Sequence, residues 1–74
     1  MKHTFHKTVV EIDNIKHFGK YDFRHFGGML NGGFDTPGLL IGFYDGTTLE
    51  IDYGKDNWHQ RDWDYRYLEG AKGY

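Results

Sequence analysis

Cysteine and serine are both absent from this chain of 74 residues, and alanine and proline each occur once. These absences exclude nucleophilic catalysis of the Ser-His-Asp and Cys-His types, thiolate zinc sites, iron–sulfur clusters and thiol redox chemistry. The lone alanine, beside 11 glycines, argues against a mainly helical protein. Because no disulfide can reinforce so short a chain, we expect a small core and a stability of only a few kcal/mol.

Long apolar runs are also absent. The longest, residues 38–44, falls well short of the roughly 20 residues that a membrane-spanning helix needs. Residues 1–7 lack the apolar region of a signal peptide. We therefore expect one soluble, cytoplasmic domain over residues 1–74, with no membrane contact.

Glycine-rich segments do not follow a known cofactor-binding pattern. The pairs at 27–28 and 32–33 are not followed by the Lys-Ser/Thr of a phosphate-binding loop, and we expect no cofactor. Residues 27–33 are instead predicted to form a mobile loop, whose tip could contact a partner.

Aromatic residues are abundant, with six Phe, six Tyr and two Trp. Each can bury roughly 150–250 Å², which compensates for the small aliphatic content. The net charge is only −2. No overall field therefore attracts the chain to nucleic acid or to anionic lipid.

The clearest local pattern predicts a β-hairpin centred on Asp45-Gly46. Strand-like segments at 39–44 and 47–53 flank this dipeptide, which is typical of a two-residue type I′ turn. The first of these segments is apolar on both faces and is expected to be central in a sheet. With a two-residue loop, one face of the hairpin carries Leu40, Tyr44, Leu49, Ile51 and Tyr53.

Two further strands and two turns complete the expected sheet. Residues 4–12 and 20–26 alternate between apolar and polar positions, which predicts two strands. Residues 14–19 are predicted to form a turn, with one helical turn over 14–18 as the alternative. Proline and glycine within 35–38 predict a β-turn there.

The C-terminal quarter allows two interpretations. Residues 62–67 alternate and favour a strand with Trp63, Tyr65 and Tyr67 on one face. The alternative is a helix that is capped by Asp56 and stops at Gly70. The expected fold class is mainly β or α+β: a small antiparallel sheet or barrel of four to five strands around the central hairpin, with a C-terminal helix in the second interpretation.

The surface left by this fold favours a binding protein over an enzyme. Tryptophan, tyrosine and arginine dominate the energetics of protein interfaces, and a chain of this size has little room for a catalytic cleft. We expect a non-enzymatic protein that docks on a larger protein and modulates or inhibits it, as small phage and mobile-element inhibitors do. An exposed strand edge would also permit a homodimer. The expected partner-binding residues are Trp58, His59, Arg61, Asp62, Asp64 and Tyr74.

Two alternative functions remain open. Residues 16–19 and 24–27 repeat a basic-His-Phe-Gly pattern, and basic residues interleaved with aromatic ones are typical of single-stranded nucleic acid binding. The residues predicted for that role are Lys16, Phe18, Lys20, Tyr21, Arg24 and Phe26. The second alternative is a minimal metal-dependent hydrolase. It would use the acid pairs at 50/52 and 62/64 with some of the five histidines, although no spacing among them indicates a metal site.

Overall fold

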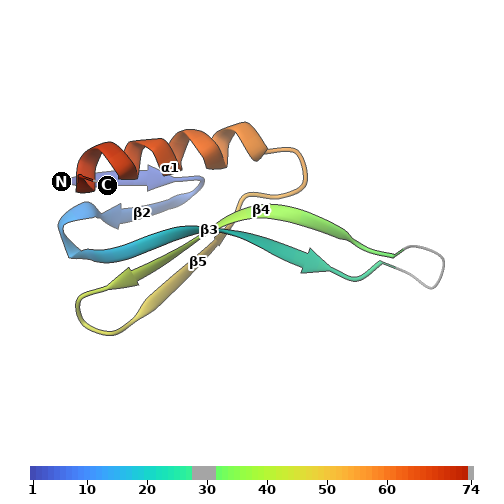
Figure 1. Cartoon of the computed structure of the whole chain (residues 1–74), viewed down its shortest axis with the longest axis horizontal. Helices are drawn as coiled ribbons and strands as arrows, with labels where there is room; N and C mark the ends of the chain where they lie inside the picture. Colours follow the sequence, from blue (N-terminus) through green and yellow to red (C-terminus); the bar gives the residue numbers. More distant parts are fainter. Residues whose placement is uncertain (28–31, 74) are drawn as a thin grey trace.

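The computed structural model describes residues 1–27 and 32–73, and this part of the chain forms two antiparallel sheets and one C-terminal helix (Figure 1). The fold is therefore mainly β with four to five strands, as expected, but the strands belong to two sheets and no barrel closes. The elements are β1 (Lys2–Phe5), β2 (Thr8–Glu11), the 3-10 turn η1 (Ile12–Asn14), β3 (Ile15–His25), β4 (Phe34–Phe43), β5 (Thr48–Asp52) and α1 (Trp58–Lys72).

The core lies on one side of the three-stranded sheet, whose strand order is β3-β4-β5. The β1–β2 hairpin and α1 both pack on that side (Figure 1). Phe5 and Val10 come from the hairpin, Leu39 and Ile51 from the sheet, and Leu68 from the helix, and all five side chains are buried together. The opposite face of the sheet is covered by no described element, and this leaves it open to solvent.

The single strand expected over residues 4–12 is instead a hairpin. The chain reverses at His6, which has a φ of 58°, and Phe5 pairs with Thr8. Histidine enters the left-handed region more readily than most residues. No Gly, Asn or Asp marked the turn, which is why the sequence pattern did not reveal it.

Both turns expected around the long strands are wrong. Residues 15–19 belong to β3, and the short 3-10 turn η1 lies directly before them. Residues 35–38 belong to β4, although Pro37 has no N–H to donate. The Pro37 carbonyl accepts from the amide of Tyr53 at 2.9 Å, just beyond the end of β5. Because the nitrogen of a strand residue points to the same side as its carbonyl, Pro37 removes no hydrogen bond from the β3–β4 ladder.

The Asp45-Gly46 hairpin is confirmed, but its expected turn is wrong by one residue. The Phe43 amide donates to the Thr47 carbonyl at 2.9 Å, so the loop contains three residues, and only Gly46 within it has a positive φ. Leu39 therefore pairs with Ile51 and shares its buried face, whereas Leu40 points outward. A slip of one residue exchanges the two faces of a strand.

The strand expected over residues 62–67 is also wrong, because these residues lie within α1. The helix begins after Asn57 and ends before Gly73, which has a φ of 79°, rather than extending from Asp56 to Gly70. Trp63, expected in the core, is 72% exposed. The positions that α1 buries are Arg61, Asp64 and Leu68.

Candidate functional site

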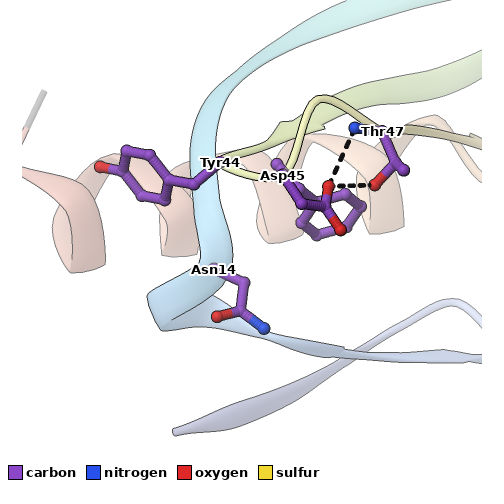
Figure 2. A pocket seen from close by; sticks show the side chains of 5 residues that line it. Asn14, Tyr44, Asp45 and Thr47 are labelled. Carbon is purple, nitrogen blue, oxygen red and sulfur yellow. Dashed lines mark hydrogen bonds between the residues drawn. The ribbon is translucent and has the colours of Figure 1, made fainter.

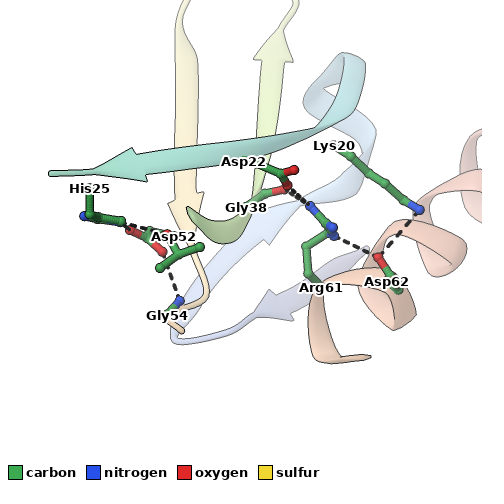
Figure 3. Close-up of polar contacts among 9 residues, drawn as sticks. Lys20, Asp22, His25, Gly38, Asp52, Gly54, Arg61 and Asp62 are labelled. Carbon is green, nitrogen blue, oxygen red and sulfur yellow. Dashed lines mark hydrogen bonds and ion pairs between the residues drawn. The ribbon is translucent and has the colours of Figure 1, made fainter. Parts of the chain in front are cut away.

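Arg61 is buried between α1 and the three-stranded sheet, where it is 6% exposed. Its Nη1 donates to Asp22 Oδ1 and to the Gly38 carbonyl, each at 3.2 Å, and its Nε donates to Asp62 Oδ1 at 2.8 Å (Figure 3). The Arg61 hydrogen bond holds the pKa of the Asp62 carboxyl below its usual value, and Lys20 adds to this effect. The guanidinium of Arg61 therefore fixes the helix to β3 and β4.

Asp64 performs the same task one turn further along α1. The Tyr53 hydroxyl donates to Asp64 Oδ2 at 2.6 Å, and His3 Nε2 lies 3.2 Å from Oδ1. The His3 ring also stacks on Tyr67, with centroids 3.9 Å apart. Burial, followed by the bond to Asp64, raises the pKa of the Tyr53 hydroxyl. This group joins the helix to β1 and to the segment after β5.

These two networks change the expected partner-binding set. Arg61 and Asp64 are buried and hold the fold together, so the prediction that Arg61 lies outside is wrong. Trp58 and His59 are exposed, as that prediction requires, and Asp62 is half-buried. Tyr74 lies outside the described residues.

The outward side of α1 presents a side chain that the sequence pattern assigned to the core. Trp63 lies between two open hollows, one of about 360 Å³ lined by Trp63, Arg66 and Tyr67, the other of about 270 Å³ lined by His59, Gln60 and Trp63. These five residues are called the Trp63 face. Their spacing of three and four residues around Trp63 follows the helix period and was the signal that could have revealed the face. Within the described part of the chain, Arg66 forms no ion pair.

The uncovered side of the three-stranded sheet is the second exposed surface. On it, Tyr21 and Phe34 are 47% and 41% exposed, and Leu40 is half-buried. The rings of Phe23 and His17 lie against Gly38 and Gly42 of β4, where an added Cβ would approach them to within 2.0 and 2.1 Å. This surface, called the outer sheet face, consists of His17, Tyr21, Phe23, His25, Phe34, Leu40, Glu50 and Asp52.

His25 forms a polar group at one end of the outer sheet face (Figure 3). Its Nε2 lies 2.8 Å from Thr36 Oγ1 and 3.2 Å from Asp52 Oδ2. Because the same ring nitrogen makes both contacts, His25 lacks the two-sided arrangement of a catalytic triad. Although burial acts to raise it, the pKa of Asp52 lies below its usual value, because the Gly54 amide, the Thr36 hydroxyl and His25 stabilise the carboxylate.

The residues proposed for nucleic acid do not gather on one surface. Phe18 packs edge-on against Tyr65 of α1, and Lys20 lies 3.5 Å from Asp62 and over the same Tyr65 ring. Arg24 pairs with Asp35 at 3.2 Å. Tyr21 occupies the opposite face of β3, Phe26 follows the end of the strand, and Lys16 is exposed near its start.

A hollow of about 440 Å³ opens beside the three-residue turn and is lined by Asn14, Phe43, Tyr44, Asp45 and Thr47 (Figure 2). Asp45, the carboxylate among these five residues, accepts from the Thr47 hydroxyl and amide at 2.6 and 2.9 Å, which lowers its pKa. These bonds show that Asp45 stabilises the turn.

The acid pairs considered for hydrolysis are far from forming one ladder. Glu50 and Asp52 lie on the outer sheet face, whereas Asp62 and Asp64 lie on α1, across the core. Among residues 1–27 and 32–73, no three His, Asp or Glu side chains gather to hold a metal ion. In the same residues, no helix has the length and hydrophobicity that a membrane crossing requires.

Comparison with protein-family models, curated proteins and solved structures finds no match to this chain.

Proposed function

We propose that this chain is a non-enzymatic binding protein of the cytoplasm that docks on a larger protein through the Trp63 face and modulates or inhibits it. The observation that carries the proposal is the position of Trp63, which is 72% exposed at the centre of a helix face and contributes nothing to the core. Tryptophan and arginine are the residue types that most often dominate the energy of an interface.

The chemistry of the Trp63 face indicates the chemistry of its partner. An indole with a hollow on each side fits an apolar pocket, and Arg66, which has no ion pair among the described residues, fits a carboxylate at the rim of that pocket. The partner surface is therefore apolar with an acidic border. Arg61 and Asp64 hold α1 rigidly, so docking orders little beyond the side chains themselves.

The test compares Trp63→Ala with Tyr44→Ala, a matched loss of an exposed aromatic that is 67% exposed in the turn after β4. Each protein is immobilised, the proteins retained from a nuclease-treated lysate are identified, and the affinity for the purified partner is measured. We expect one partner to bind wild type and Tyr44→Ala equally. Loss of a central anchor of about 2 kcal/mol corresponds to a roughly 30-fold weaker Kd for Trp63→Ala.

Circular dichroism and thermal melts must show that Trp63→Ala remains folded, as the exposure of the side chain predicts. Equal affinity of Trp63→Ala and wild type for every retained protein would contradict the proposal. Material that is retained from an untreated lysate but not from the nuclease-treated one would instead support nucleic acid binding.

A further inference from the structure

Charged side chains are distributed unequally between the two faces of the three-stranded sheet. Strand positions 17–25, 34–43 and 48–52 contain two cations, Lys20 and Arg24, and both lie on the helix side of β3, paired with Asp62 and Asp35. Glu50 and Asp52 of β5 lie on the outer side. Lys16 lies in the irregular start of β3, before the paired positions that define the two faces. At those paired positions, the outer face carries two carboxylates and no lysine or arginine.

The rings of the outer sheet face add to the same negative potential. Tyr21 and Phe23 meet edge-on with centroids 5.0 Å apart, and His25 stacks on Phe34 at the same distance. The face of an aromatic ring carries a partial negative charge and attracts cations. Because Gly38 and Gly42 have no side chains, the Phe23 and His17 rings lie directly against the backbone of β4.

One cation of the chain itself lies beside the rings of the outer sheet face. Lys55, in the loop after β5, holds its Nζ 5.2 Å from the centroid of the Phe34 ring. Tyr21 and Phe23, further along the sheet, have no described cation over them. A cation from a second molecule could therefore lie over the Tyr21 or Phe23 ring in the same way that Lys55 lies over the Phe34 ring.

We propose that the outer sheet face binds a basic, arginine-bearing segment of a protein partner, with guanidinium groups over the Tyr21 and Phe23 rings and paired with Glu50. Arginine fits better than lysine, because its planar guanidinium stacks on aromatic rings and forms two parallel bonds to one carboxylate. Phosphate groups of nucleic acid or lipid would meet two carboxylates here. The site is separate from the Trp63 face, which lies across the core.

The experiment uses a labelled octa-arginine peptide as the probe and an octa-glutamate peptide as its opposite. Fluorescence anisotropy gives the Kd for wild type, Tyr21→Ala and Glu50→Gln, and backbone amide chemical shifts locate the peptide. We expect octa-arginine to bind and octa-glutamate not to bind. Each substitution should weaken binding about two- to fivefold, as expected for an exposed cation–π contact or ion pair of up to about 1 kcal/mol.

Three controls separate this site from the alternatives. Tyr21→Phe keeps the ring and should bind as wild type does. Glu69→Gln makes the same charge change as Glu50→Gln but on α1, and should have little effect. Trp63→Ala should retain full affinity for octa-arginine, so that this proposal and the docking role of Trp63 can fail independently.

Four outcomes would overturn the proposal. The first is that wild type fails to bind octa-arginine. The second is an equal effect of Glu69→Gln and Glu50→Gln, which would reveal only general charge attraction. The third is a set of shifted amides on α1 instead of β3 and β5. The fourth is self-association without peptide that shifts the outer-face amides, which would assign this surface to a second copy of the chain.

Discussion

At the scale of single residues, the helix is attached to the sheet by polar side chains. Arg61, Asp64 and Tyr53 are buried, and every buried side-chain nitrogen or oxygen among the described residues has a hydrogen-bond partner. Charged groups are rarely buried unless they are paired in this way. Removing one partner costs more than the bond itself contributes, because the group that remains is left desolvated and unpaired.

Tyr53→Phe tests this account at neutral pH. The substitution keeps the buried ring but removes the 2.6 Å hydrogen bond to Asp64 Oδ2. We expect the free energy of unfolding to fall by about 1–3 kcal/mol. Urea denaturation measures the change, with Tyr21→Phe, which alters an exposed hydroxyl, as the control. A loss no larger than that of the control would contradict the account.

The same hydroxyl predicts a dependence of stability on alkaline pH. The pKa of Tyr53 is raised above its ordinary value of 10.0 in the folded state, so the folded chain keeps a proton that the unfolded chain releases. The stabilising contribution is complete below pH 10 and is lost as the pH rises further, by about 1.4 kcal/mol per pH unit. Stability should begin to fall between pH 9 and 10 and approach this slope by about pH 11, and the fall should disappear in Tyr53→Phe. A slope that persists in the variant would assign it to other groups.

At the scale of elements, the sequence located one hairpin but not its register. Asp45-Gly46 marks the turn correctly, because glycine with a positive φ is needed there. A loop of two or of three residues fits the same dipeptide. Hydrophobic pattern normally decides between them, but β4 is apolar on both faces, so neither register was disfavoured. The faces of β4 were therefore exchanged, whereas Leu49, Ile51 and Tyr53 were grouped correctly.

The helix was misjudged for a different reason. Its buried positions 61, 64 and 68 have the helix period, but two of the three are charged, and hydrophobic periodicity does not register them. Trp63, Tyr65 and Tyr67 alternate along the chain and produced a strand signal instead. This error also hid the candidate site, because Trp63 was assigned to the core. Polar networks between elements depend on residues distant in sequence, such as His3 and Asp64, and cannot be found from local pattern.

Alanine at Gly70 and alanine at Gly73 should change the free energy of unfolding in opposite directions. Space around both is open, but Gly70 lies in the helix, whereas Gly73 has a φ of 79° after it. Gly70→Ala should raise the free energy of unfolding by about 0.5–1 kcal/mol, and Gly73→Ala should lower it by about 1 kcal/mol. Thermal melts would show shifts of several degrees. Equal effects of the two variants would contradict the observed helix end.

Two glycines of β4 make a second matched pair. A Cβ at Gly38 would lie 2.0 Å from the Phe23 ring and 2.7 Å from the Ile51 carbonyl oxygen, which belongs to the backbone of β5. The three atoms nearest to a Cβ at Gly42 all belong to the His17 ring, which is exposed and can rotate away. Gly38→Ala should therefore cost about 1–3 kcal/mol, and Gly42→Ala less than about 1 kcal/mol. Comparable losses in urea denaturation would mean that the His17 ring is held more firmly than its exposure suggests.

At the scale of the whole molecule, the chain places two different surfaces on opposite sides of one core. The Trp63 face offers an indole with a cation, and the outer sheet face offers rings with carboxylates. A domain with one sheet and one helix layer always leaves a sheet face open, unless another layer or a partner covers it. Because the two surfaces differ in charge and share no residue, a substitution on one can be tested without altering the other.

Carboxylates that connect secondary-structure elements also make the stability of the whole fold depend on acid pH. Asp62 connects α1 with β3 through Lys20, and Asp52 connects β5 with His25 of β3. Both have a pKa lowered from 3.8 in the folded state, so their stabilising contribution is present above that pH and is lost as the pH falls through the lower folded values. Unfolding midpoints in urea should therefore be constant from pH 7 to 5 and decline below about pH 4. Because the two side chains are 39% and 48% exposed, solvent screens each contribution, and the decline should be gradual and smaller at high salt. Asp62→Asn should lower the midpoint at pH 7 and flatten the decline below pH 4, whereas Asp35→Asn, which changes an exposed pair within the β3–β4 ladder, should leave the acid dependence as it is in wild type.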